Sequence, residues 1–266
     1  MKIGVFDSGF GGLTVLRALV ERLPGAGYVY LGDTARLPYG AKSRATVARY
    51  AVSSAGFLID QGAEYLVIAC NTASALALDA IREAVLAPVL GVIETGANAA
   101  QASTKTGDVL VIATAATVES HAYAAACEAR GLRAYEMACP LLVPLVEEGW
   151  IEHPVTDEVL RIYLEELLAE SERAGLQPDT LVLGCTHYPL LRKQIERKLP
   201  EGIRVIDSAE ATAVQVAAAL DLPEAGTGSE PQRVFYATDS VEKFRRLGTR
   251  FLGQPIDDVQ LIDLGG

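Results

Sequence analysis

The chain has 266 residues, half of them hydrophobic, and so exceeds the roughly 100 to 150 residues of a typical single domain. Its formal net charge of −11 argues against a nucleic-acid partner, because binding to a phosphate backbone needs a clustered basic surface. Met1-Lys2 leads directly into an apolar strand rather than a signal peptide, and no apolar run reaches the roughly 18 residues of a membrane span. We therefore expect a cytoplasmic protein without a membrane partner, whose thiols stay reduced.

Apolar strands and amphipathic helices alternate along the whole chain. Leucines recur at helical spacing from Leu13 to Leu23, which predicts a helix that ends before Pro24-Gly25. A second helix is expected to begin near the capping residue Ser43. The expected strands cover residues 3–6, 28–31, 66–69, 89–92, 109–113, 134–137, 181–184, 204–206 and 234–236, and the expected loops cover 34–40 and 223–231. Such alternation is typical of α/β proteins with parallel sheets.

Two of these strands end in a cysteine within nearly the same local sequence. Cys70 and Cys185 each follow a continuous apolar run and precede small polar residues and a helical pattern. The strands that end at Asp7 and Thr114 extend the similarity, since each begins a segment that later reaches its cysteine. We infer two related α/β halves. The alternative is chance, because buried parallel strands are all rich in Val, Ile and Leu.

The position of the two thiols indicates a type of chemistry. Open α/β folds bind ligands at the C-terminal ends of their strands, where a helix N-terminus can stabilise a thiolate. Inverting a carbon stereocentre requires a base on one face and an acid on the other. A pair of cysteines suits both roles, because the free thiol has a pKa of about 8.5. Cys70 and Cys185 therefore predict stereoinversion or proton transfer at carbon.

The sequence contains no pattern for a metal or a cofactor, and we expect neither. No cysteine has another within a few residues, as a zinc site would require. No lysine lies at a strand end beside glycines, as pyridoxal phosphate would require. The turn from Asp7 to Gly12 either simply reverses the chain or offers backbone N–H groups and Ser8 to an anion. Cys127 and Cys139 are expected to be small buried hydrophobes, and His121 and His153 to lie at the surface.

Four motifs together resemble those of the glutamate racemases, which belong to the cofactor-independent aspartate/glutamate racemases. They are Asp7-Ser8-Gly9-x-Gly11-Gly12-Leu13-Thr14-Val15, Pro38-Tyr39-Gly40, Ala69-Cys70-Asn71-Thr72-Ala73 and Gly184-Cys185-Thr186-His187-Tyr188-Pro189-Leu190-Leu191. The resemblance extends from residue 3 to about residue 253, and the two cysteine motifs are its most specific part.

The resemblance implies a role for individual residues. Cys70 would face the α-proton of the D-enantiomer and Cys185 that of the L-enantiomer. Asp7 would assist Cys70, whereas His187, paired with Glu147, would assist Cys185. The implied substrate contacts are Ser8, Tyr39, Gly40, Asn71, Thr72, Thr114, Thr117 and Thr186. Taken without the resemblance, Asp7 could simply cap a turn, Glu147 would be assigned to the surface, and the threonines could be helix N-caps.

The expected architecture is α/β with two pseudo-symmetric domains, each a mostly parallel sheet flanked by helices. The first domain is expected to comprise residues 1–97 and 208–266 and to carry Asp7 and Cys70. The second is expected to comprise residues 98–207 and to carry Thr114, Cys185 and His187. The active site would lie in the cleft between them. The resemblance implies a bacterial homodimer that interconverts L- and D-glutamate and supplies D-glutamate for peptidoglycan.

Two alternatives remain open at the level of the residues. A racemase for aspartate or a hydantoin could use the same cysteine pair, because no arginine falls within the matched motifs except Arg36 in the loop, so the motifs rather than the pocket select glutamate. A non-catalytic protein with two lobes that close on a small anion could use the cysteines for packing. Replacing Cys70 and Cys185 with serine distinguishes a racemase from a binding protein. A racemase would lose turnover while it keeps its affinity for the ligand, whereas a binding protein would be little affected.

Overall fold

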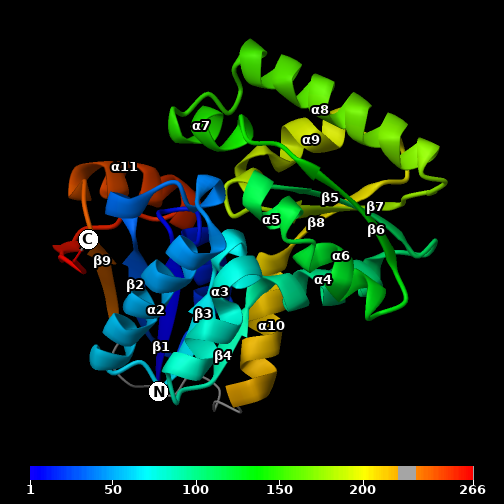
Figure 1. Ribbon diagram of the computed structural model, residues 1–266. Helices are drawn as coiled ribbons and strands as arrows, with labels where there is room; N and C mark the ends of the chain where they lie inside the picture. The colour runs from blue at the N-terminus through cyan, green and yellow to red at the C-terminus, as the bar shows by residue number, and fades with distance from the viewer. Residues whose placement is uncertain (221–231, 266) are drawn as a thin grey trace. The chain divides into compact units, whose positions relative to one another are not determined.

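A computed structural model describes residues 1–220 and 232–265 of the chain (Figure 1). The expected loop at 223–231 lies outside these residues. Contacts between Cα atoms divide the chain into two compact units. The first unit combines Met1–Val92 with Ala209–Gly266, and the second is Ile93–Ser208.

The first unit is built on a parallel sheet with the strand order β10-β9-β2-β1-β3-β4 in its described residues. Its strands are β1 (Lys2–Asp7), β2 (Gly27–Gly32), β3 (Tyr65–Ile68), β4 (Val89–Gly91), β9 (Arg233–Ala237) and β10 (Gln260–Leu261). Its helices are α1 (Leu13–Arg22), α2 (Arg44–Asp60), α3 (Asn71–Ala84), α10 (Ser208–Leu220) and α11 (Val241–Leu252), with the short 3-10 helices η1 (Thr34–Arg36) and η2 (Tyr39–Ala41). Helices α2 and α3 pack together over strands β1 to β3, where Phe6, Leu58 and Ile68 are fully buried.

The second unit contains a parallel sheet with the order β6-β5-β7-β8. Its strands are β5 (Asp108–Ala113), β6 (Arg133–Ala138), β7 (Thr180–Gly184) and β8 (Arg204–Asp207). Its helices are α4 (Val92–Ser103), α5 (Ala115–Glu119), α6 (Ala122–Glu128), α7 (Leu142–Glu147), α8 (Pro154–Arg173) and α9 (Arg192–Lys198), with the 3-10 helix η3 (Tyr188–Leu191). The expected α/β class with two parallel sheets flanked by helices is therefore confirmed.

The two sheets share one strand order over four strands. In the first unit this order is β2-β1-β3-β4, and in the second it is β6-β5-β7-β8. The corresponding first strands β1 and β5 lead to Asp7 and Thr114, and the corresponding third strands β3 and β7 lead to Cys70 and Cys185. The shared order, together with the matching positions of Asp7 with Thr114 and of Cys70 with Cys185, agrees with the inferred duplication. One expected strand is shorter than predicted, because Val92 already begins helix α4.

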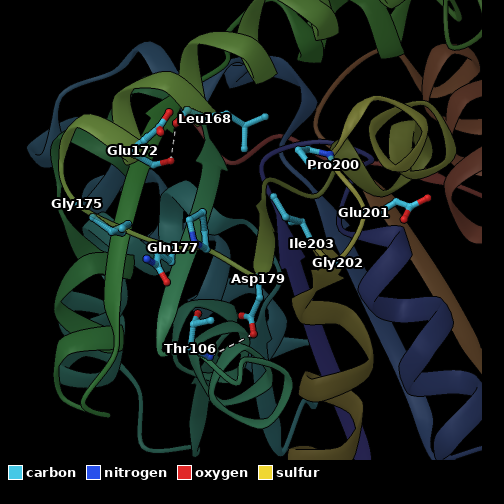
Figure 2. Close-up of a pocket in the computed structure, with 13 residues that line it drawn as sticks. Thr106, Leu168, Glu172, Gly175, Gln177, Asp179, Pro200, Glu201, Gly202 and Ile203 are labelled. Atoms are coloured by element: carbon cyan, nitrogen blue, oxygen red, sulfur yellow. Dashed lines mark hydrogen bonds between the residues drawn. The ribbon is translucent and has the colours of Figure 1, made fainter.

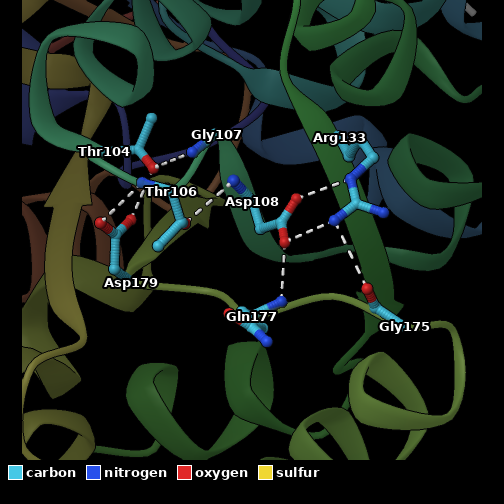
Figure 3. A network of polar contacts seen from close by, with 8 residues as sticks. All are labelled: Thr104, Thr106, Gly107, Asp108, Arg133, Gly175, Gln177 and Asp179. Carbon is cyan, nitrogen blue, oxygen red and sulfur yellow. Dashed lines mark hydrogen bonds and ion pairs between the residues drawn. The ribbon is translucent and has the colours of Figure 1, made fainter.

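Two hydrogen-bonded carboxylates fix the start of the second sheet (Figure 3). Asp108, which is 3% exposed, accepts hydrogen bonds from Arg133 Nε and Nη2 at 2.8 and 2.7 Å and from Gln177 N at 2.7 Å. Asp179 accepts from Thr104 Oγ1 at 2.5 Å and from the next two backbone N–H groups, those of residues 105 and 106. Because these carboxylates are satisfied within the network, they act as structural anchors for the loops before β5 and β7.

Among the described residues, no helix combines the length and the apolar character needed to cross a membrane.

Candidate active site

In the first unit, Cys70 lies at the junction between strand β3 and helix α3. Its sulfur caps the helix, since Sγ accepts a hydrogen bond from Ala73 N at 3.4 Å. The thiol donates to Ser8 Oγ, also at 3.4 Å. Cys70 is only 5% exposed. The strand end and the helix N-terminus thus hold the thiol in a fixed position beside the glycine-rich turn after β1.

The surroundings of Cys70 favour its protonated form. Burial and the negative charge of Asp7 raise the pKa of the Cys70 thiol to about 12, and the hydrogen bonds with Ser8 and Ala73 oppose this only in part. Asp7 is 1% exposed, and its Oδ2 accepts from Gly9 N at 2.9 Å. In this unit Cys70 can therefore donate a proton at neutral pH. To act as a base, it needs a nearby cation or a group such as Asp7 that accepts its proton.

The remaining candidate residues of the first unit surround this thiol. Asn71 and Thr72 form the first turn of α3 and are each 3% exposed. Tyr39 and Gly40 belong to η2, and the Tyr39 ring packs against Phe6 with centroids 6.1 Å apart. Burial and the charge of Asp33 raise the pKa of Tyr39 far above its usual range, and the nearby Cys70 adds to the effect. The first unit therefore brings together the seven residues expected there, which are Asp7, Ser8, Tyr39, Gly40, Cys70, Asn71 and Thr72.

In the second unit, Cys185 begins a chain of contacts that ends at a carboxylate. Cys185 follows β7 and is 6% exposed, with Sγ 3.9 Å from Nδ1 of His187. The other ring nitrogen of His187, Nε2, lies 3.2 Å from Oε1 of Glu147. Glu147 is the last residue of helix α7, and its side chain is 16% exposed. The structure thus places the imidazole between a thiol and a carboxylate, an arrangement suited to proton transfer.

The contacts of His187 determine its charge. Burial by itself would lower the pKa of the imidazole, but the hydrogen bonds and charges of Cys185 and Glu147 outweigh it and raise the pKa of His187 to about 10. His187 is therefore an imidazolium at neutral pH in this unit, and its ring lies beside the Cys185 sulfur.

The stability of the protein should reflect this pairing. The pKa of His187 is raised from its usual value of about 6.5 to about 10, so the stabilisation is complete below about pH 6.5 and is lost as the pH rises to about 10. We expect the Glu147→Gln variant to unfold at a lower temperature than the unaltered protein near pH 6.5 and to approach it near pH 10.

Thermal unfolding across this pH window measures the effect. The matched control is Glu148→Gln, which removes a charge from the exposed neighbouring residue. A difference between the Glu147→Gln variant and the unaltered protein that stays constant over the window would contradict the pairing.

The three candidate threonines of the second unit, Thr114, Thr117 and Thr186, lie in the segments that directly follow strands β5 and β7. Thr114 caps helix α5, since its Oγ1 accepts from Thr117 N at 3.4 Å. The hydroxyl oxygens of Thr114 and Thr117 are 2.9 Å apart. Thr186 is 8% exposed and separates Cys185 from His187 in sequence. A hydroxyl that caps a helix can also contact an anion, so the capping role and the site role of Thr114 are compatible.

Tyr188 belongs to the motif around Cys185, although the sequence alone predicts no function for it. Its hydroxyl is fully buried and lies 3.1 and 2.9 Å from the carbonyl oxygens of Ala113 and Cys139, to which it donates. These carbonyls lie at the ends of the neighbouring strands β5 and β6, so Tyr188 connects the turn that carries His187, after β7, to the ends of these two strands. The only sequence signal was an aromatic residue next to the histidine. Asp33, which is also buried, was missed entirely.

The remaining cysteines and histidines occupy the positions expected for them. Cys127 and Cys139 are both 0% exposed, and both His121 and His153 are exposed. His153 caps helix α8. Within the described part of the chain, no group of three His, Cys, Asp or Glu side chains has the arrangement of a metal site.

A cavity of about 650 Å³ in the second unit lies away from these residues (Figure 2). Its lining includes Thr106, Asp179 and Ile203, which come just before strands β5, β7 and β8. Cys185 follows the opposite end of β7. Because the strands are parallel, the cavity lies at the N-terminal ends of the strands and the thiol at their C-terminal ends. The cavity is therefore not part of the candidate site.

Comparisons with known proteins agree with these features. A family model described as Asp/Glu/Hydantoin racemase matches residues 3–216. The chain is 52% identical to a glutamate racemase of Koribacter versatilis, over 99% of this chain and 98% of that relative. It superposes on a glutamate racemase of Bacillus anthracis with a TM-score of 0.90 and 37% identity, covering 98% and 97% of the two chains. The glutamate racemase of Francisella tularensis, solved with D-glutamate, gives a TM-score of 0.88 and 36% identity over 99% and 97%.

Proposed function

The chain belongs to the Asp/Glu/Hydantoin racemase family, and from that membership we propose that it interconverts L- and D-glutamate without a cofactor. The observation that carries the proposal is the strand order shared by the two sheets, in which the third strand of each unit leads to a buried cysteine beside an ionisable side chain. Asp7 is the partner in the first unit, and His187 with Glu147 is the partner in the second. The relatives that match over nearly the whole chain are named glutamate racemases.

We propose a mechanism with two bases. One thiolate removes the α-proton of glutamate, which leaves the electron pair of the C–H bond on the α-carbon and its carboxylate. The thiol on the opposite face then donates its proton to the α-carbon and inverts the centre. Cys70 would accept the proton of the D-enantiomer, and Cys185 that of the L-enantiomer. Asp7 would take up and return the proton of Cys70, whereas the imidazolium of His187, held by Glu147, would stabilise the thiolate of Cys185.

The substrate contacts form the second part of the proposal. The two domains would be residues 1–97 with 208–266 and residues 98–207, and each would supply one of the two thiols. Backbone N–H groups at the start of α3 suit a carboxylate of the substrate, because an N-terminal helix end attracts anions. The residues that would contact the substrate are Ser8, Tyr39, Gly40, Asn71, Thr72, Thr114, Thr117 and Thr186.

The cellular role follows from the activity. D-glutamate is a component of peptidoglycan, so we propose that the protein acts in the bacterial cytoplasm and supplies the cell wall. We also propose that it works as a homodimer, since this is what the resemblance to glutamate racemases implies.

Solvent isotope incorporation tests the reaction. In deuterated water, the product formed from either enantiomer should carry deuterium at the α-carbon, because a thiol exchanges its proton with solvent before it donates. Chiral chromatography with mass spectrometry measures both conversion and labelling. Aspartate and a hydantoin are offered in parallel. If either of them is turned over faster than glutamate, that compound is the substrate. If glutamate binds but is not turned over, the protein is instead the two-lobed anion-binding protein.

A further inference from the structure

A buried carboxylate outside the proposed acid/base groups holds the loop that carries Tyr39 and Gly40. Asp33 follows strand β2 and is 0% exposed. Its Oδ2 accepts a hydrogen bond from Tyr39 Oη at 2.5 Å and pairs with Arg36 Nη1 at 3.4 Å. Its Oδ1 accepts from Thr238 Oγ1 at 2.9 Å. A buried carboxylate needs such donors, so Asp33 fixes each of these side chains relative to the others.

The hydroxyl of Thr238 takes part in two hydrogen bonds. It donates to Asp33, and it accepts from the backbone N–H of Ala35 at 2.9 Å. The next residue, Asp239, makes two hydrogen bonds with the Thr34 hydroxyl. The Asp239 carbonyl oxygen accepts from Thr34 Oγ1 at 2.5 Å, and the Asp239 N–H donates to Thr34 Oγ1 at 2.9 Å. Thr238 follows strand β9, which pairs with β2. The segment after β9 is therefore hydrogen-bonded to the loop through the backbone groups of Asp239 and through the side chain of Thr238.

The loop has few bonds of its own to keep its shape. Its internal backbone hydrogen bonds run from Arg36 N to Asp33 O at 3.2 Å and from Lys42 N to Tyr39 O at 3.0 Å. The Arg36 guanidinium rests on the ring of Tyr50, 4.5 Å from its centroid. The hydrogen bonds that Asp33 accepts and those that Thr238 donates and accepts therefore help to order residues 34–41, together with the burial of Tyr39 and the hydrogen bond from Arg36 to the Gly265 carbonyl.

We propose that Asp33 and Thr238 form a clamp that positions Tyr39 and Gly40 for the substrate. This inference rests on the proposed racemase function and extends it to the part of the chain beyond residue 216, where the match to the family model ends. Both are positioning residues, since they act through Tyr39 and the loop and not on the reacting atoms.

The clamp should affect substrate affinity more than the chemical step. Without it, the loop must be ordered when glutamate binds, and that entropy is lost equally in the bound ground state and the transition state. A single net hydrogen bond contributes about 0.5 to 1.5 kcal/mol, which corresponds to a roughly 2- to 12-fold change in an equilibrium constant. We therefore expect a rise in KM of this size and a kcat close to that of the unaltered protein.

Thr238 offers a matched pair of substitutions. Thr238→Val keeps the shape and removes the hydroxyl, so KM for glutamate should rise by about 2- to 12-fold in both directions. Thr238→Ser keeps the hydroxyl and should restore the KM. The control is Tyr28→Phe in the same sheet, whose hydroxyl donates to Leu19 O and Leu23 O, away from the loop.

Hydrogen exchange of the loop gives a readout that does not depend on activity. The amide of Ala35 should exchange faster in Thr238→Val than in Thr238→Ser, and glutamate should reduce the difference. If Thr238→Val leaves both the exchange and KM unchanged, or lowers kcat with KM unchanged, the clamp is wrong. If the unaltered protein does not racemize glutamate, the proposed function fails instead, and unchanged exchange of Ala35 would still reject the clamp on its own.

Discussion

Replacing either Cys70 or Cys185 with serine should reduce racemization of glutamate by about 10²- to 10⁴-fold or more. The base is a thiolate, and a serine hydroxyl is far too weak an acid to form a comparable anion at neutral pH. Both sulfurs are nearly buried, and each is held by defined neighbours, Ser8 and Ala73 for Cys70 and His187 for Cys185. Circular dichroism and glutamate affinity should stay close to those of the unaltered protein. The matched control is Cys127→Ser, at a buried cysteine of helix α6 that has no expected role, and it should retain activity.

A glutamate analogue with a leaving group on the β-carbon distinguishes the two thiols. Elimination needs only one deprotonation, so each single variant should still process one enantiomer. The Cys185→Ser variant should eliminate from the D-form through Cys70, and the Cys70→Ser variant from the L-form through Cys185. Elimination from the same enantiomer by both variants would show that the two thiols do not address opposite faces.

The Gly12→Ala substitution should strongly destabilise the first unit and disturb the Cys70 half of the site. A Cβ atom at Gly12 would lie 2.6 Å from the Cβ of Asp7 and 2.9 Å from that of Ala69, the residue before Cys70. Both neighbours lie at strand ends and are buried, so neither can move without shifting the backbone. Overpacking of this kind typically destabilises by about 1 to 3 kcal/mol.

Chemical denaturation of Gly12→Ala together with the single-enantiomer elimination assay measures both effects. The control is Gly56→Ala in helix α2, where an added Cβ would meet nothing within 4 Å. Since alanine favours a helix by about 0.5 to 1 kcal/mol over glycine, this variant should be slightly more stable. A Gly12→Ala protein as stable and as active on the D-analogue as Gly56→Ala would contradict the crowding around Asp7.

Much of the fold could be predicted because it depends on local patterns. Apolar runs of strand length separated by helical patterns specify parallel sheets, and the C-terminal ends of parallel strands meet at one edge. That rule alone groups Asp7 with Cys70 and Thr114 with Cys185. The duplication was visible for the same reason, since the polar residues at the strand ends recur in the same order as the strands.

Contacts between segments far apart in sequence were not predictable in this way. Glu147 looked like a surface residue near a helix end, and only the resemblance to glutamate racemases paired it with His187, 40 residues later. Asp33 showed no pattern at all, because Thr238, one of its donors, is 205 residues away. Tyr188 bonds to backbone carbonyls, which leave no signature in the side chains. Such partners depend on how elements pack, which hydrophobic periodicity does not encode.

The two thiols have chemically unlike neighbours, a carboxylate at Cys70 and an imidazolium at Cys185. Enantiomers in water have the same free energy, so the equilibrium constant for their interconversion is unity at every pH. The Haldane relation then requires kcat/KM to be equal in the two directions, however different the two acid/base groups are. The asymmetry between Asp7 and His187 can therefore appear only as matched differences in kcat and KM. The enantiomer that turns over faster at saturation must also require proportionally more substrate to reach it.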